Sequence, residues 1–84
     1  MNVTTIVENA IRKVLEVPEN HPLNEGLLEN GINSLRFIQL VIELELQLDI
    51  EFSDEYLSED NLSTITIEEF SNYIIDNFGI SNQG

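Results

Sequence analysis

Ser34 is the residue best placed for covalent chemistry in this chain. It stands in the stretch NGINSLRF, which leads into a long apolar segment. Catalysis by a serine needs a base within hydrogen-bond reach, and nothing in the sequence places the single histidine, His21, beside it. A serine at a helix start can hold a phosphate group, because free backbone N–H groups and the positive end of the helix dipole face it. The same position suits a helix cap, formed by Ser34 or Asn33.

Other chemistries find little support in the residue types. The chain has no cysteine, so it lacks a thiol nucleophile and a thiolate metal site. The acidic stretch DEYLSEDN lacks the alternating oxygen ligands and central glycine of a calcium loop. No glycine-rich phosphate loop is present. We therefore expect neither a metal site nor an enzyme.

The net charge of the chain limits the classes of molecule that it can bind. The chain has three basic and sixteen acidic residues, which gives a formal net charge of −13. Such a surface repels nucleic acid and anionic lipid, and it attracts proteins with basic patches. The sequence also has no apolar run of the roughly 18 residues that a membrane span needs and no signal-peptide pattern. We expect a cytoplasmic protein that binds neither nucleic acid nor membranes.

The apolar spacing predicts an all-α fold. Residues 3–17 form one amphipathic helix, with Thr5 and Glu8 as its capping box and Pro18 at its end. A long first loop follows, pinned to the core by three leucines: Leu23, Leu27 and Leu28. Two further helices complete the main set, one from Asn33 or Ser34 to about Leu48 and one that starts with the capping box Thr66–Glu69 and ends at Gly79.

A short helical turn is expected between the last two main helices. It would lie within residues 53–62, with Tyr56 and Leu57 facing inward, after an extended connector LDIEF. The predicted architecture is a small four-helix bundle of three main helices and one short helix.

The second main helix has more apolar surface than one core face requires. Its apolar residues spread over about 240° of the helix circumference, whereas a surface helix needs little more than about 100°. Five of them form the expected core side: Phe37, Leu40, Val41, Leu44 and Leu48. The remaining stripe is expected to bind partners: Leu35, Ile38, Ile42 and Leu46, flanked by Arg36, Gln39 and Glu45. A central helix buried on both sides is the alternative.

The segment GINSLRFIQLVIELELQLDIEFSDEYL resembles the acyl carrier and peptidyl carrier protein family, and the similarity extends over about residues 4–78. The resemblance implies that a phosphopantetheinyl transferase moves 4'-phosphopantetheine from coenzyme A onto Ser34, between Asn33 and Leu35. It also implies that the thiol of this arm carries acyl or aminoacyl groups as thioesters. Partners would then be the transferase and the enzymes that load and process these groups, through basic or apolar docking patches on the second helix.

Two features differ from the pattern of fatty-acid carriers. Asn33 replaces the aspartate that often precedes the serine, and Arg36, Gln39 and Leu46 make the helix face less acidic. This face favours nonribosomal peptide or polyketide assembly over housekeeping fatty acid synthesis. We expect a freestanding, monomeric carrier domain over residues 1–84, with loose ends at 1–3 and 79–84. An unmodified carrier-like adaptor that only binds proteins is the main alternative, and a small acidic chaperone or inhibitor is the third.

Overall fold

The computed structural model describes residues 2–52 and 65–79 of the chain. These residues form three α-helices, α1 (Val3–Leu15), α2 (Ser34–Leu48) and α4 (Ile67–Phe78), and one 3₁₀ turn, η1 (Leu28–Asn30). No strand occurs among the described residues, where the only β pairing is an isolated bridge between Gly26 and Thr66. The all-α prediction is confirmed. The short helix expected within residues 53–62, with Tyr56 and Leu57, lies outside the described residues.

Helix α1 begins earlier than the capping box predicted. Its N-cap is Asn2, whose Oδ1 accepts from the Thr5 backbone N–H at 3.2 Å. Val3 is therefore the first helical residue and is fully buried. The expected capping box at Thr5 is wrong, and so is the expectation that Asn2 and Val3 are loose.

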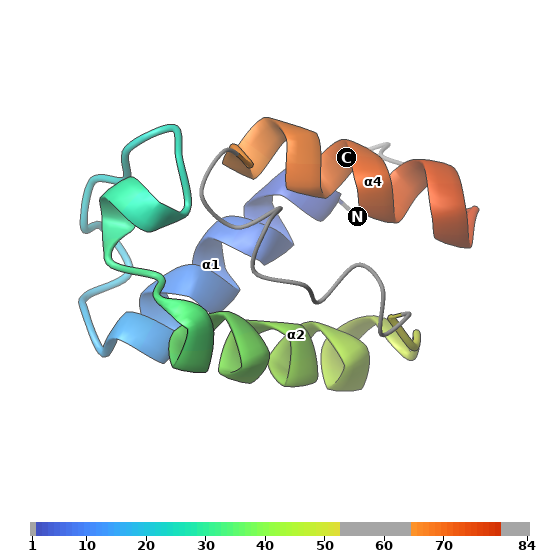
Figure 1. Ribbon diagram of the computed structural model, residues 1–84, viewed down its shortest axis with the longest axis horizontal. Helices are drawn as coiled ribbons and strands as arrows, with labels where there is room; N and C mark the ends of the chain where they lie inside the picture. Colours follow the sequence, from blue (N-terminus) through green and yellow to red (C-terminus); the bar gives the residue numbers. More distant parts are fainter. Residues whose placement is uncertain (1, 53–64, 80–84) are drawn as a thin grey trace.

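Helix α1 lies between the other two helices and packs against both (Figure 1). It ends at Leu15, where Glu16 adopts a left-handed conformation with a φ of 59°. The Glu16 backbone N–H donates to the carbonyl oxygens of Arg12 and Lys13, and the Val17 N–H also donates to the Arg12 carbonyl at 3.0 Å. These bonds satisfy carbonyl groups that have no helical donor at a helix end. The following Pro18 prevents continuation of the helix.

Two backbone hydrogen bonds, one on each side of Gly26, join the first loop to the residues around the start of α4. Leu27 N–H donates to the Ile65 carbonyl at 3.2 Å, and Ile67 N–H donates to the Glu25 carbonyl at 2.8 Å. Leu27 is fully buried and Leu23 is half-buried, as expected.

One of the three leucines expected to pin this loop points outward. Leu28 is 49% exposed, and the fully buried Ile32 fills the core instead. Between them Gly31 has a φ of 94°, a conformation that favours glycine and ends the 3₁₀ turn. This reversal of the chain sends Ile32 inward just before α2 begins.

One core joins the three helices and the connector after α2. Phe52 is buried in it, with ring centroids 5.7 Å from Phe70, 6.1 Å from Tyr73 and 5.4 Å from Phe78. Such distances are typical of favourable aromatic contacts. The fully buried aliphatic members include Val7, Ile11, Leu40, Leu44 and Ile74. This packing fixes the position of α2 and thus of its first residue, Ser34.

Candidate functional site

Ser34 is the first residue of α2 and is exposed. Asn33 is the N-cap, and its Oδ1 accepts from the Arg36 backbone N–H at 2.9 Å. The Asn33 carbonyl accepts the first helical bond from Phe37 N–H at 2.8 Å. Asn33 has extended backbone angles, as an N-cap requires. Of the two capping possibilities left open by the sequence, the structure thus selects Asn33.

The position of Ser34 is compatible with a phosphodiester. The first backbone N–H groups of a helix lack helical acceptors, and the helix dipole makes this end positive. A phosphate on an exposed first residue would lie close to these groups. Asn33 is neutral, so the cap adds no negative charge beside that position. The residues present therefore fit a covalently attached phosphate.

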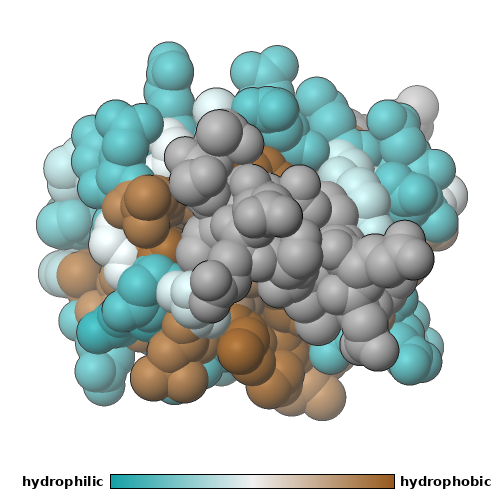
Figure 2. Space-filling model, viewed as in Figure 1, coloured by the Kyte–Doolittle hydropathy of each residue, from teal (hydrophilic) through white to brown (hydrophobic). Residues whose placement is uncertain are grey.

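Helix α2 has the two faces that its apolar arc predicts. Phe37, Leu40, Val41 and Leu44 are buried, and Leu48 is half-buried. On the other side lie four exposed apolar residues, which we call the α2 stripe: Leu35, Ile38, Ile42 and Leu46. Brown side chains accordingly gather along the lower edge of Figure 2, where α2 lies in Figure 1. Gln39, beside the stripe, is exposed as well.

The two charged residues expected to flank the stripe, Arg36 and Glu45, are bonded to other parts of the chain. Arg36 Nη1 donates to the Val14 carbonyl oxygen in the last turn of α1, at 2.8 Å. Glu45 Oε2 accepts from the Phe52 backbone N–H at 2.9 Å. Both residues are half-buried. Arg36 thus holds α1 to α2, and Glu45 holds the connector in place.

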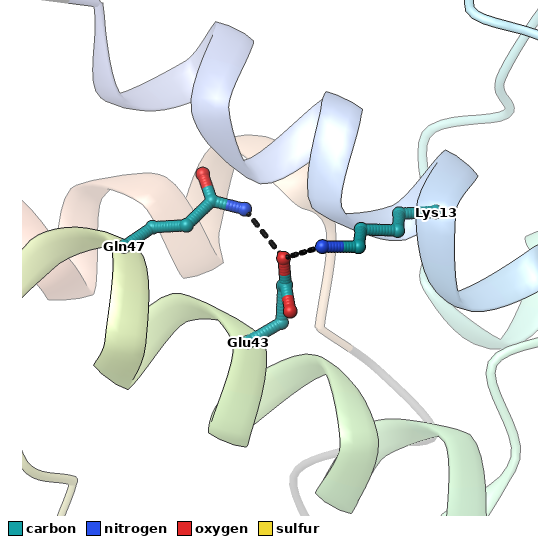
Figure 3. A network of polar contacts seen from close by, with 3 residues as sticks. All are labelled: Lys13, Glu43 and Gln47. Carbon is teal, nitrogen blue, oxygen red and sulfur yellow. Dashed lines mark hydrogen bonds and ion pairs between the residues drawn. The ribbon is translucent and has the colours of Figure 1, made fainter.

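A third polar contact joins α1 to the middle of α2 (Figure 3). Lys13 Nζ lies 2.6 Å from Glu43 Oε1, and the same oxygen accepts from Gln47 Nε2 at 2.9 Å. The hydrogen bond from Lys13 holds the pKa of the Glu43 carboxyl below its usual value, and the bond from Gln47 adds to this shift. The carboxylate of Glu43 therefore stays charged and paired at neutral pH.

A shallow hollow lies between the end of α1 and the first half of α2. Asn33 and Leu35, the two neighbours of Ser34, both line it, together with Lys13, Arg36 and Glu43. The sequence did not single out Lys13, Val14, Glu43 or Phe52. Their hydrogen bonds join positions far apart in the chain, which helical periodicity does not relate.

Within the described residues, no group of three His, Asp or Glu side chains could hold a metal ion. None of the helices of the described segments combines the length and the apolarity that a membrane span requires.

Comparison with known proteins gives one family match. A family model described as the phosphopantetheine attachment site matches residues 5–74, which include Ser34 and all of α2. No curated protein and no solved structure matches the chain.

Proposed function

Because the chain belongs to the phosphopantetheine attachment-site family, we propose that it is an acyl or aminoacyl carrier modified on Ser34. Covalent 4'-phosphopantetheine is the cofactor of this family. The observation that carries the choice of residue is the exposure of Ser34 at the first position of α2. When attached, the arm supplies a thiol on which acyl or aminoacyl groups are held as thioesters.

The chain's own part in loading is to present one hydroxyl. Ser34 Oγ would form a bond to phosphorus while the pyrophosphate bond of coenzyme A breaks and the nucleotide leaves. The hydroxyl proton would pass to a base on the transferase. Asn33 and Leu35 would border the attached phosphate, since they precede and follow Ser34. The carrier therefore supplies position, and the transferase supplies the chemistry.

The α2 stripe is the proposed docking surface for the transferase and for the enzymes that load and process the carried group. Its four apolar residues begin beside Ser34 and continue to Leu46. Exposed apolar patches on small proteins often mark interaction sites. The apolar character of this surface is the argument for nonribosomal peptide or polyketide assembly over fatty acid synthesis. The same proposal includes a cytoplasmic location and a monomeric state for this protein.

Intact-mass measurement tests the proposal. The unmodified protein is incubated with coenzyme A, magnesium and a broad-specificity phosphopantetheinyl transferase. We expect the mass to increase by one phosphopantetheine in the wild-type chain and not in Ser34→Ala. Ser71→Ala serves as the matched control, because Ser71 is a buried serine whose Oγ donates to the Ile67 carbonyl in α4. Failure of several transferases to modify the wild-type chain would favour the unmodified adaptor.

A further inference from the structure

The side-chain amide of Asn30 ties together the loop that precedes Ser34. Its Oδ1 accepts from the Asn24 backbone N–H at 2.7 Å, and its Nδ2 donates to the carbonyl oxygens of Asn24 at 2.9 Å and of Gly26 at 2.7 Å. An amide has two donor hydrogens, and both are used in this way. Asn30 is half-buried at the end of η1. One side chain therefore holds three backbone groups of the loop.

Backbone hydrogen bonds continue from η1 to the start of α2, which it precedes in the chain (Figure 1). Ile32 N–H donates to the Leu27 carbonyl at 3.1 Å, and both residues are fully buried. The core thus anchors the two sides of the turn without the amide. Asn33, the N-cap of α2, follows directly. The amide of Asn30 therefore orders the polar part of the loop and, through it, the approach to α2.

A carboxylate could not replace this amide. The Asn30 Nδ2 atom lies within hydrogen-bond distance of two carbonyl oxygens. In Asn30→Asp an oxygen without a proton would face them, so both donated bonds would be lost and the oxygen atoms would repel each other. The volume of the side chain would hardly change. The substitution therefore removes the bonds and leaves the apolar residues of the core as they are.

The same change can occur without mutation, because Asn30 and Gly31 form the only Asn-Gly pair of the sequence. The Gly31 backbone nitrogen gives up its proton to solvent and bonds to Asn30 Cγ, and ammonia leaves with a proton from solvent. Water then opens the cyclic imide to aspartate or isoaspartate, so the net reaction is hydrolysis of the amide. In the fold the Gly31 N–H donates to the Leu28 carbonyl at 3.0 Å. The reaction therefore requires local opening of the loop.

We propose that Asn30 is a positioning residue for the modification of Ser34, and that hydrolysis of its amide slows attachment of the arm. This inference rests on the proposed modification of Ser34. A transferase must receive the serine in one orientation. Without the amide bonds only a fraction of the molecules hold that orientation, and the apparent affinity falls by the same fraction. The effect is therefore on KM, while kcat, which describes the bound serine, changes little.

The first experiment measures the kinetics of modification by a broad-specificity phosphopantetheinyl transferase with coenzyme A and magnesium. We expect Asn30→Asp to raise the KM for the carrier roughly tenfold and to change kcat less than about twofold. Asn9→Asp is the matched control, because it makes the same chemical change at an exposed position of α1. The Asn9 Oδ1 only accepts, from Arg12 Nη1 at 3.1 Å. Both constants of this control should stay within about twofold of the wild type.

A neutral variant separates the lost bonds from the added charge. Asn30→Ala removes the same three hydrogen bonds and should also raise KM. Circular dichroism during heating sets a temperature at which the variants are folded. If Asn30→Asp does not fold, the comparison of Asn30→Ala with the wild type decides.

The second experiment follows hydrolysis at Asn30 in the wild-type chain. The protein is aged at mildly alkaline pH, folded and in urea, and residue 30 is analysed by peptide mapping. We expect hydrolysis to be at least about tenfold slower in the folded chain, because the loop must open first. At low carrier concentration, the aged protein should lose modification rate in proportion to its content of aspartate and isoaspartate at residue 30.

Three results would overturn the inference. These are an unchanged KM in Asn30→Ala, an equal rise of KM in Asn9→Asp and Asn30→Asp, and equal hydrolysis rates in folded and unfolded protein. Intact-mass analysis of the same samples separates this inference from the proposed function. Wild-type protein that gains the arm while the Asn30 variants keep its KM contradicts only the role of Asn30. Wild-type protein that never gains the arm contradicts the function as well.

Discussion

The guanidinium of Arg36 reaches from the first turn of α2 to the Val14 carbonyl in the last turn of α1, with an Nη1 to O distance of 2.8 Å. The carbonyl groups of a helix end lack helical donors, so this bond satisfies one of them. Because Arg36 is two residues after Ser34, the bond also fixes the start of α2 against α1. The orientation of the proposed attachment residue thus depends on a contact with another helix.

Loss of this contact should destabilise the fold. We expect Arg36→Leu to lower the free energy of unfolding by about 1–3 kcal/mol, since a half-buried carbonyl loses a charged donor. Urea denaturation measures the change. Arg12→Leu is the comparison, because Arg12 donates to Asn9 and to the His21 carbonyl in exposed positions. A smaller loss in Arg36→Leu than in Arg12→Leu would contradict a bridging role for Arg36.

The cap of α2 can be separated from the modification of Ser34. Asn33→Ala should cost about 1 kcal/mol of stability, because the Arg36 N–H loses its acceptor. Asn33→Asp keeps the acceptor and adds a negative charge at the helix start, which should add about 0.3–1 kcal/mol. Thermal denaturation of the unmodified proteins checks the order Asp, Asn, Ala. Equal melting temperatures for Asn33→Ala and the wild type would exclude this cap as a stabilising element.

The Lys13–Glu43 pair should make stability depend on pH. The pKa of Glu43 is lowered in the folded state, so its contribution is present above the usual glutamate pKa of about 4.3 and is lost as the pH falls through the lower folded value. Lys13→Met removes the main cause of the shift. At neutral pH this change should cost at most about 1 kcal/mol, because Lys13 is exposed.

Urea denaturation at neutral pH and at a pH well below the usual glutamate pKa of about 4.3 checks this dependence. The difference in stability between wild type and Lys13→Met should shrink as the pH falls through the lowered pKa of Glu43. If the difference in stability between wild type and Lys13→Met were the same at both pH values, the Lys13–Glu43 pair would not be its cause.

Glu45 should protect the Phe52 amide from exchange with solvent. Its carboxylate accepts from this N–H at 2.9 Å, and Glu45→Ala removes the acceptor. Hydrogen exchange at Phe52 should become faster, and stability should fall by about 1.5–3 kcal/mol, as for other bonds to charged groups. Leu46→Ala, one residue further along α2 and largely exposed, should leave this exchange rate unchanged.

The two faces of α2 predict opposite responses to a charged residue. Ile42 is about half exposed and Val41 is buried, so Ile42→Asp should change stability by less than about 1 kcal/mol, whereas Val41→Asp should prevent stable folding. Circular dichroism during heating measures both. A collapse of the Ile42→Asp variant would place Ile42 in the core and remove the argument for a docking surface.

The sequence predicted the main helices well because their signals are local. Apolar spacing located α2 and α4 and assigned the buried and exposed faces of α2, and Thr66 caps α4 as expected, with its Oγ1 accepting from the Glu69 N–H at 3.1 Å. The predicted start of α1 at residue 3 is confirmed and its end lies two residues before the predicted residue 17. The cap of α1 was wrongly assigned, because two cap candidates, Asn2 and Thr5, stand within one turn. Leu28 was wrongly assigned to the core, because a loop has no regular periodicity that would predict which of its side chains are buried.

The polar contacts could not be predicted, for a different reason. Arg36 and Val14 are 22 residues apart, and Lys13 and Glu43 are 30 apart. No local rule relates such positions, and the side-chain directions depend on how α1 crosses α2. The sequence predicted Arg36 and Glu45 at the edge of a docking surface, but it could not show that both also bond to other parts of the fold.

Lys13 is the only lysine of the chain, and its ammonium group is bonded to Glu43 (Figure 3). Acetylation or an amine-reactive label would remove its positive charge and leave Glu43 without its main partner. A dye or sensor surface coupled through this side chain would consequently alter the packing of α1 on α2. Since the sequence has no cysteine, a single cysteine introduced at an exposed position such as Leu28 gives a selective attachment point remote from this pair in the sequence.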